Sequence, residues 1–600
     1  MSLTRSHPAR VEAPLTPAGL LPVREGRTAR GLAVSIGGWS DKGRKELNQD
    51  FHGALIPDGA ALASKGVVAA LADGISTSQV SHIAAETAVK SLLTDYHCTS
   101  DAWSVRTSAQ RVISATNSWL HAQTKRSQNA YDLDKGYICT LSALVLKGRR
   151  AHLFHVGDSR IFRVVAGGLE QLTEDHRTIL SSQESYLGRA LGMAPHVEID
   201  HRALDLSPGD VFVLATDGLY EHVEPGFVAQ TIRASADDLD GAARLVVAEA
   251  LARGSRDNLT IQIVRVEGLP DWDADGVAGP AEALPPPPLL DARAVLDGYT
   301  VLRPLHSSSR SHLYLASDAA SDTLVALKIP SIDLRDDPAY LQRFMLEEWI
   351  ARRIDSPHVV KAHKSDRHRT HLYSVMEFVD GQTLAQWMID NPKPELETVR
   401  RIVEQVASGL RAFHRREMVH GDLRPANIMV DAHGTAKIVD FGSTQVAGVH
   451  EAQPTLANDM LGTVQYSAPE YFRGEAGTPR SDLFSLGVIA YHMLTGRLPY
   501  GAAMARARTR AQQRRPRYAS AVDSGVPDWI DGALRRAVHP DPARRYDALS
   551  AFLHDLRHPN PAFTQRGRAP LYERNPLVVW KVLALAQAAA ILALIAALMR

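Results

Sequence analysis

The stretch MVHGDLRPANIMVDAHGTAKIVDFG, residues 418–442, decides how the second half of this 600-residue chain folds. Two apolar runs within it, NIMV and AKIV, have the composition of β-strands. Between them lie Asp431, His433 and Gly434, residue types that are typical of a turn. The pattern therefore predicts a β-hairpin whose two outer ends lie close together.

Three polar residues flank this hairpin: Asp422, Asn427 and Asp440. Because the ends of a hairpin meet, we expect their side chains to converge. Two carboxylates and an amide at one place suit a divalent cation with oxygen ligands and a neighbouring base. An ordinary hairpin with capping aspartates is the alternative, and the spacing and order of the three residues disfavour it.

This arrangement resembles the catalytic loop and the magnesium-binding Asp-Phe-Gly motif of protein kinases. The resemblance extends over roughly Tyr299–Leu556. It implies that Asp422 orients a substrate hydroxyl and accepts its proton, that Arg424 lies beside the γ-phosphate, and that Asn427 and Asp440 hold Mg²⁺.

The start of this region alternates like three antiparallel strands, TVLRPL, SHLYLASD and LVALKIP. In the kinase family the first two flank a glycine-rich phosphate loop. Here the loop reads HSSSRS, with His306, Ser308 and Ser311 at the glycine positions. Serine restricts the backbone more than glycine does, although serine hydroxyls can donate hydrogen bonds to phosphate.

The same resemblance assigns further nucleotide-binding residues. Lys328 matches the strand lysine that holds the α- and β-phosphates, and Glu347 matches its helical partner, with Glu348 as the second choice. Met376 and Phe378, in MEFV, match the hinge that contacts adenine.

The segment that follows the hairpin has family features as well. Gly421 stands where many kinases have an arginine that grips a phosphorylated activation loop, which argues against strict control by phosphorylation at Thr455 and Thr463. Glu470, in APE, is expected to pair with Arg545.

Acidic residues end several apolar runs in the first half of the chain. Asp50 closes GRKELNQD, Asp73 ends VVAALAD, Asp217 ends VFVLATD, and Asp257 precedes the run NLTIQIVRV. Several such strand ends at one edge of a packed sheet would form an oxygen cage for Mg²⁺ or Mn²⁺. A plain turn is the alternative for any single member, so the ordered set carries the inference.

The set resembles the metal-dependent Ser/Thr phosphatases of the protein phosphatase 2C type, over roughly Gly31–Val266. The resemblance implies a sandwich of two antiparallel sheets flanked by helices. It also implies two Mn²⁺ or Mg²⁺ ions that activate a water for attack on phosphorus. The metal ligands would be Asp50 and Asp73 with the Gly74 carbonyl for one ion, and Asp73, Asp217 and Asp257 for the other.

The chain departs from that family at several positions. Gln49 stands where a glutamate is frequent, which lowers the local negative charge. Arg44, or alternatively Lys45, would bind the substrate phosphate. Ile75 replaces a histidine that acts as an acid in some members, a role that His82 or a metal-bound water could take.

Composition limits the remaining possibilities. The formal net charge is zero, which gives no reason to expect nucleic-acid binding, and two cysteines cannot form a disulfide framework, which fits a cytoplasmic setting. Residues 1–30 are expected to be a disordered tail. Residues 268–293, with Pro285–Pro288, are expected to be a stiff spacer rather than a partner-binding motif.

The last residues are strongly apolar. Val582–Met599 contains one polar residue, Gln587, and follows Lys581 and upstream arginines. This pattern favours a single-pass C-terminal anchor in the cytoplasmic (inner) membrane with the catalytic domains in the cytoplasm, and a buried core helix is the weaker alternative.

The sequence thus predicts a multidomain α+β protein that resembles bacterial phosphatase–kinase fusions. Its expected segments are a tail (1–30), a phosphatase-like domain (31–267), a linker (268–293), a bilobal kinase domain (294–558), a juxtamembrane segment (559–576) and an anchor (577–600). ATP, Mg²⁺ and protein Ser/Thr side chains would be the ligands and substrates of the kinase domain, and phosphoproteins those of the phosphatase domain. Alternatives are an inert kinase lobe that serves as a nucleotide sensor or scaffold, and an inert phosphatase lobe that docks phosphopeptides. The oligomeric state cannot be predicted.

Overall fold

The computed structural model describes residues 31–564 except 129, 180–184, 271–283, 309, 335–336, 366, 453–464, 502–508 and 514–516, and it also describes five residues between 580 and 587. The tail 1–30 and both Thr455 and Thr463 therefore lie outside the described residues, and so does most of the apolar run Val582–Met599. Among the described residues, no helix has the length and apolarity needed to cross a bilayer.

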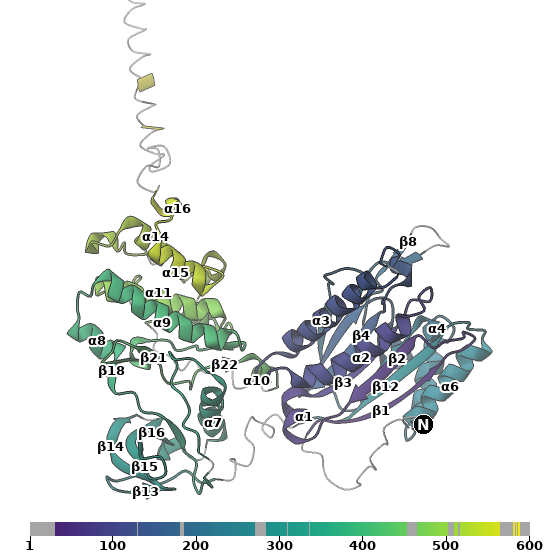
Figure 1. Cartoon of the computed structure of the whole chain (residues 1–600), viewed down its shortest axis with the longest axis horizontal. Helices are drawn as coiled ribbons and strands as arrows, with labels where there is room; N and C mark the ends of the chain where they lie inside the picture. The colour runs from purple at the N-terminus through teal and green to yellow at the C-terminus, as the bar shows by residue number, and fades with distance from the viewer. Residues whose placement is uncertain are drawn as a thin grey trace, which may run out of the picture.

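The first domain is built on two antiparallel sheets of five strands each (Figure 1), as the sequence predicted. Their strand orders are β1-β12-β11-β6-β7 and β10-β5-β4-β3-β2. A separate hairpin pairs β8 with β9. The strands are β1 (Ala33–Asp41), β2 (Asp50–Leu55), β3 (Val67–Asp73), β4 (Leu141–Lys147), β5 (Arg150–Val156), β6 (Arg160–Val165), β7 (Gly168–Gln171), β8 (Arg177–Ile179), β9 (Ser185–Leu187), β10 (Asp200–Asp205), β11 (Val211–Ala215) and β12 (Leu259–Gly268).

Helices flank the two sheets, with α2 and α3 packed on one outer face and α5 and α6 on the other. They are α1 (Gly59–Lys65), α2 (Ser81–Cys98), α3 (Val105–Arg126), η1 (Leu133–Lys135), α4 (Asp217–Tyr220), α5 (Pro225–Ala234) and α6 (Leu239–Ala252). Side chains alternate across a strand, so β3 contributes to two cores. Three of its residues pack between the sheets: Val67, Ala69 and Leu71. The three that alternate with them pack under α2 and α3: Val68, Ala70 and Ala72.

The second domain has two lobes. The smaller lobe is an antiparallel sheet in the order β13-β14-β15-β16-β17 with one long helix. Its elements are β13 (Val295–Leu296), β14 (Tyr299–Ser307), β15 (Ser311–Asp318), β16 (Thr323–Pro330), η3 (Ile332–Leu334), α7 (Pro338–Arg353) and β17 (Ser374–Glu377). The three strands predicted from the sequence are β14, β15 and β16, and their pairing is confirmed.

The larger lobe is mainly helical. Its elements are β18 (Gly381–Thr383), α8 (Leu384–Asp390), α9 (Leu396–His414), β19 (Met418–Val419), η4 (Pro425–Asn427), β20 (Ile428–Asp431), β21 (Ala436–Ile438), β22 (Gln445–Val446), α10 (Ala447–Ala452), η6 (Tyr471–Arg473), α11 (Pro479–Thr495), α13 (Arg510–Gln513), η7 (Val522–Ser524), α14 (Asp528–Ala537), η8 (Pro542–Arg544), α15 (Leu549–Arg557) and α16 (Pro561–Thr564). Strongly amphipathic α9 lies at its centre, with Val403, Leu410 and Phe413 buried.

The hairpin predicted from the deciding stretch is present as β20 and β21. Asp431 accepts hydrogen bonds at Oδ1 from the backbone amides of His433 and Thr435, at 2.9 and 2.8 Å, and Gly434 has a φ of 78°. A left-handed backbone of this kind favours glycine. These residues form the turn for the reason that the sequence suggested.

The described end of the proline-rich segment contacts the smaller lobe of the kinase domain. The carbonyl of Pro285 accepts a hydrogen bond from the amide of Leu372 at 2.9 Å. Leu290 packs against the core of the smaller lobe, and its amide bonds to the Tyr314 hydroxyl at 3.4 Å. The apolar side chain of Leu290 finds cover there, so the described end of the linker belongs to the kinase lobe's surface.

Candidate active sites

In the second domain, the structure brings the hairpin residues together as predicted. The amide of Val439 donates to the Asn427 carbonyl at 2.9 Å, which joins the two ends of the hairpin. The Asn427 side chain donates to the carbonyl and to Oδ2 of Asp422, at 2.9 and 3.1 Å. Arg424 Nε lies 3.4 Å from the same carboxylate, so it also faces Asp422.

A buried carboxylate fixes the backbone just before Asp422. Asp482, at the start of α11, accepts hydrogen bonds from the amides of His420 and Gly421 at 2.9 and 3.0 Å, and from the His414 ring at 2.9 Å. Gly421 has a φ of 79°, and a Cβ there would lie 2.7 Å from the Ser443 carbonyl oxygen. The glycine therefore suits a conformation that most side chains would strain.

Lys328 and Glu347 form the ion pair that the resemblance implied. Lys328 Nζ lies 2.7 Å from each carboxylate oxygen of Glu347 and 3.6 Å from Asp440. Burial alone would lower the pKa of Lys328, but the charges of Glu347 and Asp440 outweigh it and raise this pKa above its ordinary value. The second choice, Glu348, is wrong, because its carboxylate pairs instead with Arg352 and Arg369.

The Asp-Phe-Gly aspartate is held in a strained conformation. Asp440 has a φ of 67°, a region that non-glycine residues rarely adopt. The positive charge of Lys328 lowers the pKa of Asp440 to about 2, although burial opposes the shift. Phe441 is buried against Phe413, with ring centroids 5.5 Å apart, and its amide points to Glu347 at 3.4 Å. An ionised carboxylate beside an amide oxygen fits Mg²⁺.

The glycine-poor loop closes on itself through a serine. Ser308 Oγ accepts from the Ser311 amide at 3.1 Å and from the Arg310 amide at 3.3 Å. Ser308 thus ties the turn that glycines would otherwise leave free. Met376 ends the buried part of β17, opposite Ala326, and Phe378 follows that strand half-buried. Among the expected nucleotide residues, the structure shows a direct contact between Lys328 and Glu347.

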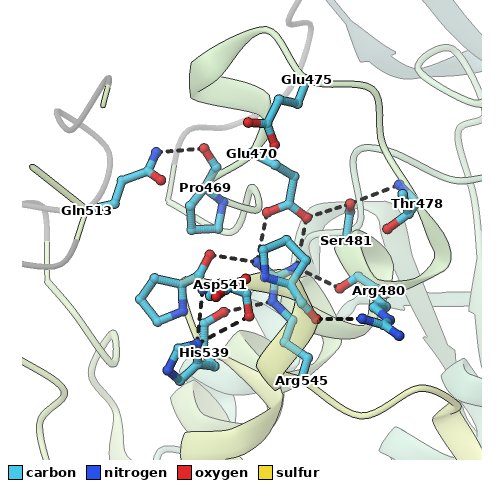
Figure 2. A network of polar contacts seen from close by, with 12 residues as sticks. Pro469, Glu470, Glu475, Thr478, Arg480, Ser481, Gln513, His539, Asp541 and Arg545 are labelled. Atoms are coloured by element: carbon cyan, nitrogen blue, oxygen red, sulfur yellow. Dashed lines mark hydrogen bonds and ion pairs between the residues drawn. The ribbon is translucent and has the colours of Figure 1, made fainter. Parts of the chain in front are cut away.

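Glu470, in the sequence APE, lies in a second buried network of polar contacts (Figure 2). Glu470 accepts two hydrogen bonds from Arg545, at 2.8 and 2.7 Å, and one from Ser481 at 2.7 Å. Gln513 donates to the neighbouring Pro469 carbonyl at 2.7 Å. The predicted pairing of Glu470 with Arg545 is confirmed, and its role is structural.

In the first domain, two of the predicted aspartates face each other. Asp50 begins β2 and Asp73 ends β3, and the two are register partners. Thr216 and Thr260 donate to Asp50 Oδ2 at 3.0 and 2.7 Å. Among the described residues, its Oδ1 is buried without a hydrogen-bond partner.

Crowded carboxylates raise one another's pKa here. Burial raises the pKa of Asp50 to about 6. Burial, followed by the charges of Asp50, Asp217 and Asp158, raises the pKa of Asp73 well above its ordinary value. Burial and the charges of Asp158 and Asp257 raise the pKa of Asp217 to about 7. Buried carboxylates of this kind are costly unless a cation neutralises them, so the donor set fits Mg²⁺ or Mn²⁺.

Basic side chains already contact the outer members of the group. Arg177 donates to Asp158 Oδ2 at 2.7 Å and to Asp217 Oδ2 at 3.0 Å. Lys45 forms an ion pair with Asp257, whereas its neighbour Arg44, the preferred phosphate ligand, is exposed. Within the described part of the chain, no three His, Cys, Asp or Glu side chains are as close as the ligands of one ion.

The sequence did not identify Arg177. It lies on the short strand β8, and no motif marks it; its partner Asp158 lies in the turn after β5. Gly74 occupies the turn after Asp73, where a Cβ would lie 2.7 Å from the Ser81 carbonyl oxygen. The Gly74 amide also donates to the Gln49 carbonyl at 3.1 Å, so this turn packs closely against its neighbours.

Gln49 has a structural role that the sequence did not reveal. Its Nε2 donates to the carbonyls of Ile75 and Ser78, at 3.2 and 2.6 Å, and to Ser81 Oγ at 2.6 Å. A glutamate cannot donate these bonds. The departure from the family pattern therefore fixes the 75–81 turn beside the carboxylates. His82 is the second residue of α2, and its Nδ1 is buried without a hydrogen-bond partner among the described residues.

Comparison with known proteins matches each of the two domains to a family. Residues 299–556 match the family "Protein kinase domain", and residues 38–252 match "Protein phosphatase 2C". The chain therefore combines a protein phosphatase 2C-like domain with a Hanks-type Ser/Thr kinase domain.

Individual relatives align with one domain at a time. Serine/threonine-protein kinase PrkC of Bacillus subtilis is 30% identical over 271 residues, which are 45% of this chain and 41% of that protein. Serine/threonine-protein kinase PknL of Mycobacterium tuberculosis is 35% identical over 265 residues, 44% of this chain and 64% of that protein. This chain thus covers less than two thirds of either kinase. A serine/threonine phosphatase structure from S. agalactiae is 27% identical, with a TM-score of 0.35, and covers 39% of this chain and 100% of that one.

Proposed function

We propose that this chain is a bifunctional enzyme that phosphorylates protein Ser and Thr side chains with ATP and hydrolyses phospho-Ser and phospho-Thr. The observation that carries the kinase half is the close pairing of Lys328 with Glu347 beside Asp440. Lys328 would hold the α- and β-phosphates, and Asp422 would accept the proton of the substrate hydroxyl. Mg²⁺ bound by Asn427 and Asp440 would supply neutralising charge for the transferring phosphoryl group.

The observation that carries the phosphatase half is the facing pair Asp50 and Asp73, with raised pKa values and an unpaired buried oxygen in the described structure. Asp217, Asp257 and the Gly74 carbonyl would complete the ligand set for two divalent cations. These ions would supply Lewis acidity for hydrolysis of a phosphate ester. Arg44, or alternatively Lys45, in the loop before Asp50, would orient the substrate phosphate.

One experiment tests both halves together. The full chain, Asp440→Asn and Asp257→Asn are each assayed for γ-phosphate transfer to protein and for phosphopeptide dephosphorylation, with Mg²⁺ and Mn²⁺ supplied. We expect Asp440→Asn to abolish only the transfer and Asp257→Asn to abolish only the dephosphorylation, so that each variant is the control for the other. A wild-type protein without one of the activities would refute that half.

The Ser308 loop favours a second candidate for the kinase half, in which the lobe binds nucleotide without transferring phosphate. Nucleotide binding by Asp440→Asn and by the wild type, measured by calorimetry in the absence of protein substrate, separates the two. Wild-type binding without transfer would support this sensor or scaffold role.

We further propose that Val582–Met599 anchors the enzyme in the cytoplasmic membrane with both domains in the cytoplasm. The support is the apolar composition of this run and the preceding Lys581. Membrane retention through carbonate washing is the expected result, and deletion of residues 577–600 should release the protein. Retention after that deletion would contradict the proposal.

A further inference from the structure

The loop that joins α2 to α3, residues 99–104, lies where the two domains meet (Figure 1). We propose that this docking loop is an intramolecular clamp between the two domains. With it, the phosphatase domain holds α7 in the position that pairs Glu347 with Lys328, and it also holds α10, which follows the Asp-Phe-Gly motif. The inference rests on the proposed kinase activity only for its consequence, since the docking itself can be measured without catalysis.

The tip of the docking loop is inserted into the kinase domain. Ala102 has 0% exposure and belongs to the same buried cluster as Ile350 and Ile354 of the α7 region and Val446 and Val449 around α10. It is the one member of that cluster contributed by the first domain. An apolar side chain buried among those of another domain indicates a packed interface rather than a chance surface contact.

Backbone contacts show how closely the two domains approach. The Gly448 amide donates to the Ala102 carbonyl at 3.0 Å. A Cβ at Gly448 would lie 2.5 Å from the Asp101 carbonyl oxygen and 2.7 Å from that of Trp103. The Gly448 carbonyl in turn accepts a hydrogen bond from buried Lys147 at 2.6 Å. Glycine at the start of α10 therefore permits an approach that a side chain would prevent.

Charged groups complete the contact at the end of α7. Arg353 donates from Nη2 and Nε to the two carboxylate oxygens of Asp101, at 2.8 and 3.2 Å. Burial would raise the pKa of Asp101, but the hydrogen bonds and charge of Arg353 outweigh it and lower this pKa. Because Arg353 ends the helix that carries Glu347, Asp101 holds that helix from the first domain.

A second carboxylate, contributed by the kinase domain, accepts hydrogen bonds from the phosphatase domain. Glu417 accepts from the Ser104 amide at 2.7 Å and from Thr107 Oγ1 at 2.5 Å, at the N-terminus of α3. An anion is favoured at that helix end. Glu417 directly precedes β19, which leads into Asp422, and Trp103 donates to the nearby Arg415 carbonyl at 3.2 Å. The clamp thus reaches α7, the approach to the catalytic loop, and α10.

The clamp lies at the end of the sandwich opposite the carboxylates. Lys65, just before β3, donates to Thr99 and to the Ser100 carbonyl, each at 2.7 Å, whereas Asp73 ends the same strand. A strand rises about 3.3 Å per residue, so β3 separates the two ends by roughly 20 Å. Disrupting the clamp should therefore change the kinase site and leave the phosphatase site unchanged.

Charge reversal tests the clamp in the full-length protein. The variants are Asp101→Arg, Arg353→Asp and the double exchange, with Asp95→Arg as the matched control because exposed Asp95 bonds to Thr94 on its own helix. The first readout is hydrogen exchange at the Ser104 and Gly448 amides, which are bonded across the interface, and along α7. The second readout is the kcat/KM of both reactions.

We expect each single reversal to speed exchange at both amides and in α7 and to lower kinase kcat/KM about tenfold, with phosphatase kcat/KM unchanged and with recovery in the double exchange. Unchanged exchange in the single variants would overturn the docking, and faster exchange at Ser104 and Gly448 without any change in α7 would overturn the clamp. If the wild type transfers no phosphate, the proposed function fails, while α7 exchange still decides the clamp.

Discussion

Arg545 binds both carboxylate oxygens of Glu470: Nη1 lies 2.8 Å from Oε1 and Nη2 lies 2.7 Å from Oε2, and the two side chains are 0% and 3% exposed. Removing one partner of a buried ion pair leaves the other charge without compensation. We therefore expect Arg545→Leu to lower the free energy of unfolding of the kinase domain by about 3–5 kcal/mol.

Urea unfolding, followed by tryptophan fluorescence, measures that change. Exposed Arg544, its neighbour in sequence, provides the matched control, and Arg544→Leu should change stability by less than about 0.5 kcal/mol. Equal effects of the two variants would show that the loss does not come from the buried pair.

Asp50→Asn should stabilise the metal-free phosphatase domain while abolishing its activity. The pKa of Asp50 is raised from 3.8 to about 6, so its ionisation opposes folding increasingly as the pH rises from 3.8 to 6, and fully above that. At about 1.4 kcal/mol per pKa unit, the gain at pH 7 in chelator should reach up to about 3 kcal/mol.

Adding metal should stabilise the wild type more than the Asp50→Asn variant. Mn²⁺ should raise the unfolding temperature of the wild type more than that of Asp50→Asn, because only an intact ligand set binds the ion tightly. Exposed Asp58→Asn serves as the control and should respond as the wild type does. An equal Mn²⁺ effect in both proteins would contradict a metal role for Asp50.

Gln49→Glu should destabilise the first domain even though it restores the residue frequent in the family. The substitution removes a donor that serves three acceptors, and it adds a negative charge beside Asp50. The expected loss is about 1–3 kcal/mol in chemical unfolding at pH 7. Exposed Gln128→Glu makes the same chemical change and should be close to neutral; a comparable loss there would contradict the hydrogen-bond argument.

His152 should make the first domain sensitive to acid. Burial, with the nearby charges of His201, Arg150 and Lys147, lowers the pKa of His152 from 6.5 to about 3. The unfolded chain then binds the proton more readily, so the stability present above pH 6.5 is lost as the pH falls toward 3. Between pH 7 and pH 5 this one group should cost about 2 kcal/mol.

Unfolding at the two pH values in wild type and His152→Gln measures that contribution. The variant should lose about 2 kcal/mol less than the wild type on acidification, whereas exposed His196→Gln should behave as the wild type does. An unchanged pH dependence in His152→Gln would rule out this imidazole as the source.

Local sequence determined much of both catalytic regions. The hairpin between Asn427 and Asp440 follows from two short apolar runs and a turn of Asp431 and Gly434, which are interactions between neighbours in the chain. The alternating strands before Lys328 and the strand-ending aspartates Asp50 and Asp73 follow from the same short-range patterning. These features could be predicted because each depends on a few adjacent residues.

Long-range partners could not be read in this way. The contact of Arg177 with Asp158 and Asp217 depends on where the β8–β9 hairpin lies relative to β5 and α4, and no local pattern encodes it. The sequence preferred Glu347 to Glu348 only through a family resemblance, and the rotation of α7 about its axis decided between them. The hydrogen bonds of the Gln49 side-chain amide depend on the tertiary position of the 75–81 turn, which supplies all three acceptors.

By itself, the sequence determined that this chain has a phosphatase-like and a kinase-like domain, and which residues could form each site. Only the tertiary structure decided that the docking loop of the first domain fits against Gly448, Glu417 and Arg353 of the second. Those contacts join residues hundreds of positions apart, and their energy comes from shape and charge complementarity between folded surfaces, which short-range sequence patterns do not encode.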